Sequence, residues 1–431
     1  MATNTEKPKI VIVGGGFGGV ELAKKLKDKP VEVLMLDRHN YHTFQPLLYQ
    51  VATGALEAET ITFPLRRIFQ NQKNFSFSLA EVLKINAEKN TLQTTIGEIT
   101  YDYLVVATGA DTNFFGNKQL EHFSMGMKSV PEAMNIRSMI LQSFEAALTE
   151  KDPLEKEELM TFVVVGGGPT GVELAGALAE FRNHILEKDY PQLDDCDMRV
   201  FVVEGKPAVL GVMSEKASAK AQKYLQEMGV TTYNNVHVQS FDGELLTIDD
   251  GRVLRTRNVF WAAGVVGQFP EGISADNIVK GRRIQTDEIN RVKGSLNIFA
   301  IGDVSAVITT DNPNGLPGVA QVALQQGTHL AKNLVAIIEG KETTPFEYND
   351  KGSMATIGRN KAVADIGKFE FSGFFAWILW CFVHVFSLLG NQKRIAVFFT
   401  WIGRYFTYNG PSRLIIRPFS RESMTEDTTA K

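Results

Sequence analysis

One pattern occurs twice in this chain of 431 residues, and it limits the possible folds more than any other feature. Residues 9–26 read KIVIVGGGFGGVELAKKL, and residues 161–178 read TFVVVGGGPTGVELAGAL. Each copy is an apolar β-branched run, a glycine cluster and then a helical pattern. Each is followed by a strand that ends in an acid, Asp37 or Glu204, and later by a strand that ends in a small-residue turn, around Gly109 or Gly264. The sequence therefore predicts two copies of one strand–helix–strand unit.

The glycines of both copies fit the GxGxxG spacing: Gly14, Gly16 and Gly19, then Gly166, Gly168 and Gly171. At this spacing the first glycine allows a tight turn, the second lets backbone approach a pyrophosphate, and the third lets helix pack on strand. The helix that follows directs its N–H groups and dipole at the phosphates. One such motif is often only a glycine-rich turn, but two complete copies favour dinucleotide binding. We therefore predict an α/β fold with two Rossmann-like domains.

The strand-final acids refine this prediction. Asp37 and Glu204 stand where a carboxylate accepts a hydrogen bond from a ribose 2′-OH. An acid at this position repels a 2′-phosphate, so Glu204 favours NADH over NADPH, although Lys206 lies close by and weakens that preference. The spacing from Gly14 to Asp37 is near the expected value of about 20 residues. The second spacing is longer, and FRNHILEKDYPQLDDCD predicts a lengthened helix and a polar loop there.

Composition excludes several classes of protein. The chain is too long for one ordinary core, so two or three domains are expected. A net charge of −4 argues against nucleic-acid binding. The two cysteines, Cys196 and Cys381, form no CxxC motif, which excludes a local dithiol centre and fits a reducing compartment. MATNTEKPKI has no leader pattern and the histidines show no metal-ligand spacing, so we expect a cytosol-facing protein without a metal.

Two dinucleotide folds in one chain suggest a flavin and a nicotinamide, and a third motif supports this. NIFAIGDVSA ends a strand at Gly302 and Asp303, where a carboxylate suits the hydroxyls of a ribityl chain. Over about residues 9–340 this arrangement resembles the two-dinucleotide-binding-domain flavoproteins, in which the NAD domain splits the FAD domain. HNYHTFQPLLYQVATGAL (residues 39–56), GLPGVAQVALQQG (residues 315–327) and the aromatic, basic C-terminal extension resemble type II NADH:quinone oxidoreductases, which are single-subunit and do not pump protons.

The resemblance implies a division of the chain and a set of ligands. The FAD-binding domain is expected at 1–117 and 285–342, the NADH-binding domain at 118–284, and a membrane-anchoring and dimerisation region at 343–431. Non-covalent FAD is expected to contact Gly14, Gly16, Phe17, Gly18, Gly19, Asp37, Arg38, Val82, Ala107, Thr108, Gly109, Asp303, Ala320 and Gln321. NADH is expected to contact Gly166, Gly168, Pro169, Thr170, Gly171, Glu173, Glu204, Ala263 and Gly264.

Three residues are candidates for a direct part in quinone reduction. In AQVALQQG, Gln321, Gln325, His329 and Asn333 repeat every four residues and form one polar stripe of a helix. The small residues Ala320, Ala323 and Gly327 allow a flat ring to approach. From the stripe alone a surface helix is an equally good reading; the resemblance makes Gln321 and Gln325 quinone-pocket residues. It gives Glu173 a proton-relay or quinone-positioning role, whereas Glu21 in the first copy suggests that this acid belongs only to the repeat.

Other activities remain open on the sequence. A soluble NAD(P)H-dependent flavoprotein, such as an NADH oxidase, a ferredoxin reductase or a protein of the apoptosis-inducing-factor type, would keep both fingerprints but has less need of the glutamine stripe. A sulfide:quinone oxidoreductase needs two cysteines at the flavin, and Cys196 and Cys381 are poorly placed to form that pair.

The C-terminal region differs in composition from the rest of the chain. Residues 353–366 alternate as short strands or a hairpin would. Residues 373–390 carry no charge and just reach the length of a membrane span, whereas residues 395–407 have a polar edge. Residues 371–421 contain basic side chains and no acid. Interfacial attachment, a helix in a dimer interface and a true span all remain possible. The resemblance implies a homodimer attached to the cytoplasmic face of the inner membrane.

Overall fold

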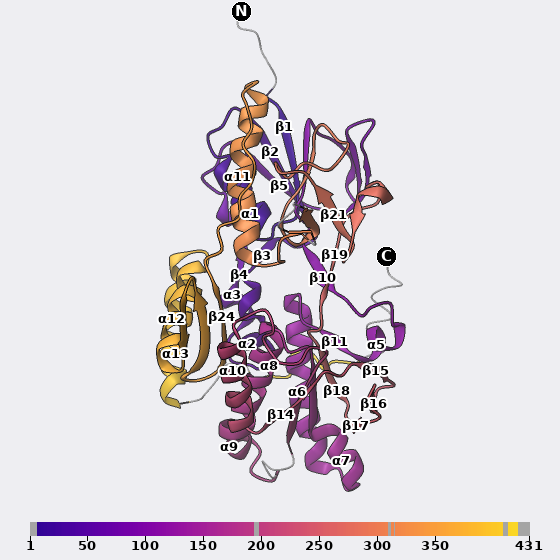
Figure 1. Ribbon diagram of the computed structural model, residues 1–431, viewed down its shortest axis with the longest axis vertical. Coiled ribbons are helices and arrows are strands. Elements are labelled where there is room, and N and C mark those ends of the chain that lie inside the picture. The colour runs from indigo at the N-terminus through magenta and orange to yellow at the C-terminus, as the bar shows by residue number, and fades with distance from the viewer. Residues whose placement is uncertain (1–6, 194–197, 309–311, 314, 408–412, 421–431) are drawn as a thin grey trace, which may run out of the picture. The chain divides into compact units, whose positions relative to one another are not determined.

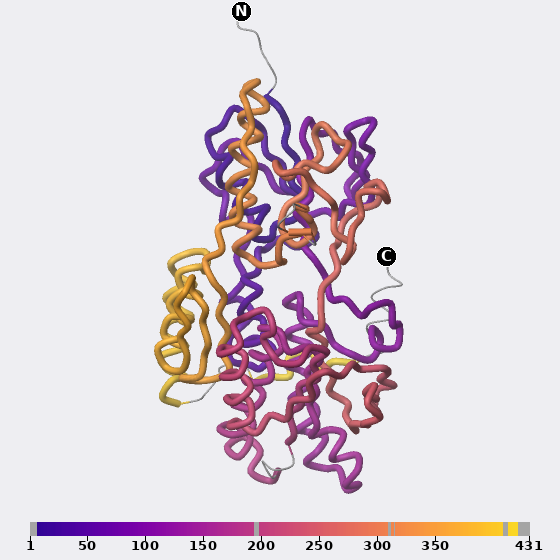
Figure 2. The backbone as a smooth tube through the Cα atoms, viewed as in Figure 1, coloured from indigo at the N-terminus to yellow at the C-terminus, as the bar shows by residue number. Residues whose placement is uncertain are grey.

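The computed structural model describes residues 7–193, 198–308, 312–313, 315–407 and 413–420 (Figures 1 and 2). The chain forms two compact units, each built from three separate segments. The first unit consists of Met1–Thr43, Thr62–Asp111 and Val265–Asp350. The second consists of Phe44–Ile61, Thr112–Gly264 and Lys351–Lys431. Each unit contains one of the two glycine motifs.

The first unit is organised around a five-stranded parallel sheet in the order β22-β9-β1-β2-β5. Its strands are β1 (Lys9–Val13), β2 (Glu32–Asp37), β5 (Phe75–Leu79), β9 (Tyr103–Val106) and β22 (Ile298–Ala300). β1 is almost wholly buried, as expected of a parallel strand covered on both faces. α1 (Phe17–Lys25) packs against α11 (Ala320–Ile338), and a side chain at Gly327 would lie only 2.6 Å from the carbonyl oxygen of Gly18. Glycine thus permits the close helix contact.

Smaller elements complete the first unit. Antiparallel strands β6 (Val82–Asn86), β7 (Thr91–Thr94) and β8 (Gly97–Thr100) form one sheet. The others are β3 (Tyr41–Thr43) with β4 (Thr62–Pro64), β10 (Ala110–Thr112) with β19 (Val265–Gly267), and β20 (Ile278–Val279), β21 (Arg283–Thr286) and β23 (Ser305–Val307). Short helical segments are α4 (Leu65–Ile68), η4 (Ala275–Asn277) and η5 (Gly302–Val304).

The second unit repeats the sheet of the first. Its parallel strands run in the order β11-β18-β12-β13-β14 and are β11 (Met125–Gly126), β12 (Thr161–Val165), β13 (Arg199–Glu204), β14 (Val230–Asn234) and β18 (Asn258–Trp261). β12 pairs with β13 on one side and β18 on the other, as β1 pairs with β2 and β9. The predicted α/β class with two Rossmann-like folds is confirmed.

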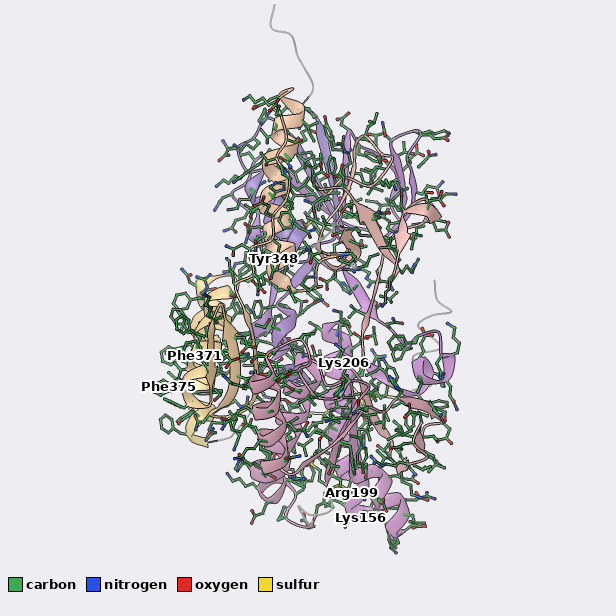
Figure 3. All side chains as sticks on the ribbon, in the orientation of Figure 1. Lys156, Arg199, Lys206, Tyr348, Phe371 and Phe375 are labelled. Atoms are coloured by element: carbon green, nitrogen blue, oxygen red, sulfur yellow. The ribbon has the colours of Figure 1, made fainter. Side chains whose placement is uncertain are left out.

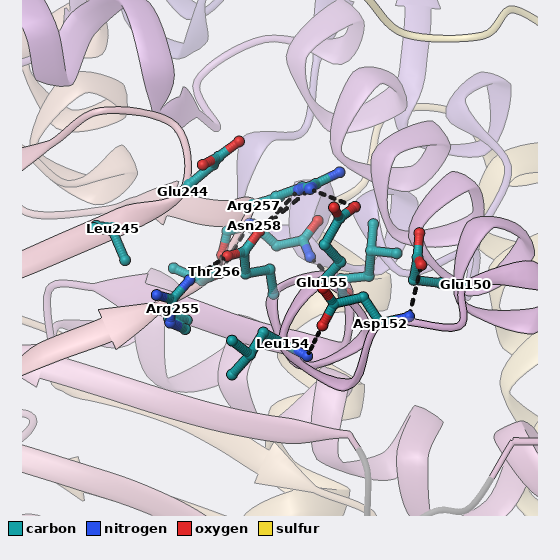
Figure 4. A network of polar contacts seen from close by, with 12 residues as sticks. Glu150, Asp152, Leu154, Glu155, Glu244, Leu245, Arg255, Thr256, Arg257 and Asn258 are labelled. Carbon is teal, nitrogen blue, oxygen red and sulfur yellow. Dashed lines mark hydrogen bonds and ion pairs between the residues drawn. The ribbon is translucent and has the colours of Figure 1, made fainter.

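Helices and a small sheet surround this second parallel sheet. The helices are η1 (Gln45–Leu47), α2 (Leu48–Ala52), α3 (Ala58–Ile61), α5 (Lys118–Phe123), α6 (Val130–Thr149), α7 (Pro153–Met160), α8 (Pro169–Phe181) and α10 (Glu215–Glu227). The small antiparallel sheet is β15 (Val238–Phe241), β16 (Leu245–Ile248) and β17 (Val253–Arg255). Beside it, Arg257 pairs with Glu155 at 3.3 Å (Figure 4). Arg255, at the end of β17, and Arg257 both pair with the buried Glu158.

One part of the prediction for the longer spacing between Gly166 and Glu204, a lengthened helix, is confirmed. α8 continues into a π-helical turn, η2 (Arg182–Leu186), and then α9 (Glu187–Asp189). This extension accounts for part of the added distance between Gly166 and Glu204. The predicted polar loop falls partly on residues 194–197, which lie outside the described residues, as does Cys196.

The C-terminal region is a three-stranded sheet followed by two helices, of which α12 packs on the sheet. The antiparallel strands β24 (Ser353–Gly358), β25 (Lys361–Ile366) and β26 (Phe369–Ser372) precede α12 (Phe374–Ser387) and α13 (Asn391–Thr407). α12 packs on the strands through Ala376, against Ala362 and Ala364, whereas α8 and α10 also contact this sheet (Figure 1). Among the described residues, no helix has both the length and the apolarity of a membrane span. The 14 residues of α12 extend only ~21 Å.

Candidate active site

The first glycine loop follows β1 and is too closely packed for any residue with a Cβ at two of its positions. Gly14 has φ +112°, and a side chain there would lie 2.3 Å from the carbonyl oxygen of Ala107. A side chain at Gly19 would lie 2.0 Å from the oxygen of Gly14. These contacts require glycine, since any Cβ would force strands and helix apart. Gly16 caps α1, and Phe17 begins it with its ring edge-on to buried His42. The first-turn N–H groups of α1 are therefore placed for a pyrophosphate.

Asp37 fixes this loop as well as ending β2. Its Oδ2 accepts a hydrogen bond from the N–H of Gly15 at 2.5 Å, and its Oδ1 accepts from the N–H of His39 at 2.7 Å. The next residue, Arg38, is exposed. A carboxylate held by two backbone donors is pre-oriented. Its predicted contact with a ribose is compatible with this geometry and stays a prediction.

The residues that follow β9 and those of η5 also belong to the candidate site of the first unit. Ala107, Thr108 and Gly109 follow β9, and the hydroxyl of Thr108 donates to the carbonyl of Gln268. Gly302, next to Asp303, has φ +75° and donates its N–H to Oε1 of Gln326 at 2.7 Å. Gln326 is buried and also donates to Asn290. Sequence reasoning missed this glutamine; its only signal is its place on the buried face of α11.

Val82 occupies a different environment from the loop residues. It begins β6 and belongs to the buried core cluster that also includes Val13, Leu36 and Val106. Its side chain is 8% exposed. The predicted flavin contact of Val82 stays a prediction, since core packing already explains the burial.

The second glycine loop reproduces the first. Gly166 has φ +107°, and its Cβ would lie 2.6 Å from the carbonyl oxygen of Ala262, the residue before Ala263. A Cβ at Gly171 would lie 1.8 Å from the oxygen of Gly166. Gly168 caps α8, and Pro169 and Thr170 form its first turn, where proline has no N–H to leave unpaired. The turn after β18 contains Gly264, with φ +119°.

Glu204 plays the part in the second loop that Asp37 plays in the first. Its Oε2 accepts from the N–H of Gly167, and its Oε1 accepts from the N–H of Lys206 at 2.8 Å. Both units thus brace the middle glycine of the GGG run with the strand-final acid. This brace was not predicted from sequence, where the acid was assigned only to the ribose.

The two glutamates of the repeated GVEL motif have different environments. Glu21 is partly exposed, pairs with Lys25 at 3.4 Å and accepts from Thr328. Glu173 is buried in α8, and burial raises its pKa to about 8, although the N–H of Thr356, 3.4 Å from Oε1, opposes this rise. The indole of Trp380 also lies close enough to favour the carboxylate, but not in hydrogen-bonding geometry. Glu173 is therefore a buried carboxyl with a raised pKa, whereas Glu21 is a partly exposed acid in an ion pair.

Glu173 lies in the wall of a cavity of about 80 Å³ within the second unit. Tyr49 and Gln50 come from α2, Glu173, Ala177 and Glu180 from one face of α8, and residues 356–359 from the end of β24. α12 and α13 contribute Trp377, Trp380, Cys381, Trp401, Arg404 and Tyr405. α8 and β24 are in close contact here, since a Cβ at Gly176 would lie 1.7 Å from the carbonyl oxygen of Ile357. The helix that begins at the second glycine loop thus also forms the cavity.

The cavity combines aromatic surface with protonatable groups. Trp380 stacks on His384 at 4.1 Å and lies 5.3 Å from the ring of Trp401. Burial raises the pKa of Glu180, while the N–H of Arg359 at 2.5 Å and the charge of Arg404 oppose that rise. Burial also raises the pKa of the Cys381 thiol to about 12, so it remains protonated. Aromatic rings with a few polar groups among them are typical of the lining of a ligand site.

Comparison with known proteins identifies the family. Residues 8–327 match the pyridine nucleotide-disulphide oxidoreductases, and residues 351–408 match the NDH2 C-terminal domain. The type II NADH:quinone oxidoreductase NdhA of Mycobacterium tuberculosis is 38% identical over 410 residues, covering 91% of this chain and 86% of that protein. This chain belongs to the type II NADH:quinone oxidoreductases. The predicted family is confirmed.

A further relative agrees with that assignment, and solved structures show the same fold. The type II NADH:quinone oxidoreductase of Staphylococcus haemolyticus is 28% identical and covers 83% of this chain and 89% of its own. Among solved structures, NDH2 from Plasmodium falciparum in complex with NADH has a TM-score of 0.86 at 22% identity, covering 96% of this chain and all of that one. The sulfide:quinone oxidoreductase of Aquifex aeolicus shares the fold, with a TM-score of 0.72 at 19% identity over 93% of this chain and 95% of that one.

In this type II oxidoreductase the polar stripe of α11 holds part of its own chain. Gln325 donates to the carbonyl of Asn349 at 2.9 Å and accepts from its N–H at 3.0 Å. Asn333 exchanges hydrogen bonds with the backbone of Thr344, whose hydroxyl lies 3.3 Å from His329. The stripe therefore binds residues 344–349 along α11, and a direct role of Gln325 toward quinone stays a prediction.

The small residues of α11 have a different role from the one predicted for them. Ala323 lies beneath Gly302 and beside α1, and Gly327 packs on Gly18. Two of the three small residues predicted to admit a flat ring are therefore used for packing between protein segments. Ala320 and Gln321 lie in the first turn, where their predicted contacts with the flavin and quinone are not tested by this packing.

Proposed function

We propose that this chain oxidises NADH and passes two electrons through FAD to a membrane quinone without pumping protons. One observation carries the activity: 38% identity over 91% of the chain to an enzyme named type II NADH:quinone oxidoreductase. FAD, when bound, supplies the redox chemistry by accepting hydride and releasing electrons. The protein contributes binding, orientation and proton supply.

The two loops are assigned to the two nucleotides. The first unit fits FAD, because Gly14, the N-terminus of α1 and the braced Asp37 form a pyrophosphate and ribose cradle, and Asp303 follows on the turn of η5. The second unit fits NADH, because Gly166, the N-terminus of α8 and Glu204 form the same cradle. These assignments support an FAD-binding domain split in sequence by the NADH-binding domain. The predicted limits of that division stay predictions.

We place the quinone ring in the cavity of the second unit. The aromatic side chains of α12 and α13 provide its apolar surface, and Glu173 provides a proton. With a pKa raised to about 8, the Glu173 carboxyl is mostly protonated near neutral pH and is a suitable donor to a quinone oxygen during reduction. Gln321 is proposed to contact the isoalloxazine, and its contact with the quinone stays a prediction; Gln325 supports the same helix.

Membrane attachment is proposed to use the outer side of the C-terminal region. Phe371 and Phe375 point outward from β26 and α12 (Figure 3), and Phe375 is 78% exposed. Further exposed apolar side chains are Ile378, Phe382, Phe386, Ile395, Phe398, Phe399, Ile402 and Phe406. Soluble surfaces rarely expose so many large apolar groups together. With basic side chains and no acid in residues 371–421, this surface suits the anionic cytoplasmic leaflet of the inner membrane.

The activity has a direct spectroscopic test. The purified protein is expected to show flavin absorbance that NADH bleaches without oxygen and that a short-chain quinone restores. If NADH leaves the flavin oxidised, the proposed function is wrong; if ferredoxin but not quinone restores the colour, the soluble-reductase alternative is favoured.

Attachment and assembly have separate tests. Flotation with vesicles containing anionic lipid is expected to carry the protein, and carbonate at high pH is expected to release it. Retention after carbonate would contradict peripheral attachment. Homodimer formation, also proposed, is tested by light scattering of the detergent-purified protein, where a monomer mass would refute it.

A further inference from the structure

One buried donor, the hydroxyl of Tyr49, reaches the cavity without a described side-chain acceptor. Tyr49 is 6% exposed; its Oη accepts from Nε2 of Gln50 at 2.8 Å, and no described side chain accepts its own proton. Buried donors normally have partners. The Tyr49 hydroxyl therefore indicates an acceptor oxygen that comes from a ligand.

Trp401 determines the direction of the hydrogen bond to Tyr49. Its indole Nε1 can only donate, and it donates to Oε1 of Gln50 at 2.9 Å. This contact places the amide oxygen of Gln50 toward Trp401 and the amide nitrogen toward Tyr49. Because that nitrogen also donates, the tyrosine oxygen is an acceptor on this side. The O–H of Tyr49 must then point elsewhere, and Tyr49 lines the cavity.

We propose that Trp401 and Gln50 are positioning residues, which act through one relay to hold the Tyr49 hydroxyl as a hydrogen-bond donor to a carbonyl oxygen of quinone in the cavity. The inference rests on the proposed function. Burial and the nearby Glu173 raise the pKa of Tyr49 well above its ordinary value, so the hydroxyl keeps its proton. The bond is polar recognition, not proton transfer.

The relay also gives α13 a second purpose. Trp401 is half-buried, while its neighbours Phe399 and Ile402 are exposed on the proposed membrane surface. The helix that meets lipid therefore fixes a donor in the cavity. Recognition of the quinone head group and attachment to its membrane are thus built on the same helix.

The test compares two Trp→Phe substitutions, each of which removes one hydrogen bond donated by an indole. Trp401→Phe keeps a ring but removes the donor, and is expected to raise KM for a water-soluble short-chain quinone about tenfold. Trp261→Phe is the control, because Trp261 is buried and its Nε1 donates to the carbonyl of Asn113, also at 2.9 Å. It is expected to leave that KM within twofold. NADH:ferricyanide activity, which does not use the cavity, is expected to remain unchanged in Trp401→Phe.

A double-mutant cycle separates a relay from a general structural effect. Tyr49→Phe removes the final donor, and Trp401→Phe added to it is expected to raise KM no further. Additive increases would overturn the relay, as would an unchanged KM in Trp401→Phe. If Trp401→Phe does not retain FAD, Gln50→Met carries the same cycle. A wild-type enzyme that oxidises NADH with ferricyanide but reduces no quinone refutes the proposed function instead.

Discussion

Replacing Glu173 by glutamine tests the physical basis of the cavity. The carboxyl has an ordinary pKa of 4.5 and a pKa of about 8 in the fold, because burial disfavours the charge. Below pH 4.5 both folded and unfolded chains hold the proton, and its contribution to stability is complete. Between these values the unfolded chain loses the proton while the folded chain keeps it, so the free energy of unfolding falls by about 1.4 kcal/mol per pH unit. Above about pH 8 the loss is complete.

Glutamine has the same shape and no proton to release. Relative to the wild type, Glu173→Gln is therefore expected to gain about 3 kcal/mol between pH 5.5 and 8, seen as a Tm difference that widens by a few degrees. The same variant is expected to lose most quinone reduction. The wild-type kcat for quinone should fall as the pH rises through about 8, and the variant should lack this limb.

Thermal unfolding of the FAD-loaded protein, followed by flavin fluorescence at several pH values, measures the Tm difference. Glu21→Gln is the matched control, since Glu21 occupies the same GVEL position but is partly exposed and paired with Lys25. Its Tm curve should run parallel to the wild type. A constant Tm difference between Glu173→Gln and wild type across this range would show that Glu173 titrates as an ordinary surface acid, and the reasoning about the cavity would fail.

Three further changes test other parts of the structure. Glu204→Ala removes the acceptor for two backbone N–H groups and the repulsion of a 2′-phosphate, so kcat/KM for NADH should fall about tenfold and the preference over NADPH should narrow, measured with both nucleotides. Gly176→Ala places a methyl group 1.7 Å from the carbonyl oxygen of Ile357 and should cost about 3 kcal/mol, seen in Tm, whereas Gly403→Ala, which meets open space, should not. Phe375→Ser removes a 78%-exposed ring and should weaken vesicle binding about tenfold without lowering Tm; unchanged flotation would contradict the proposed surface.

The glycine loops were predictable from the sequence because their requirement is local. Gly14 and Gly166 need positive φ and no Cβ, and the strands and helix that flank them show their own periodicity. The same local logic predicted the paired strands in residues 353–366 and the amphipathic α13. Of the three alternatives left open for residues 373–390, a true span is not supported, because α12 ends at Ser387 and no described helix has the length and apolarity of a span.

The environments of individual side chains could not be predicted from the sequence and became known only from the tertiary structure. The motif GVEL occurs twice with the same letters, yet Glu21 meets solvent and Glu173 is enclosed by segments far from it in the sequence. Gln325 stood out by its spacing, but Gln326 is the buried residue that fixes the turn at Gly302. Local sequence contains periodicity and turn chemistry, so it determined the two nucleotide folds and their loops. The bond between Trp401 and Gln50, 351 residues apart, has no local signal, because only packing in three dimensions decides which distant groups are buried together.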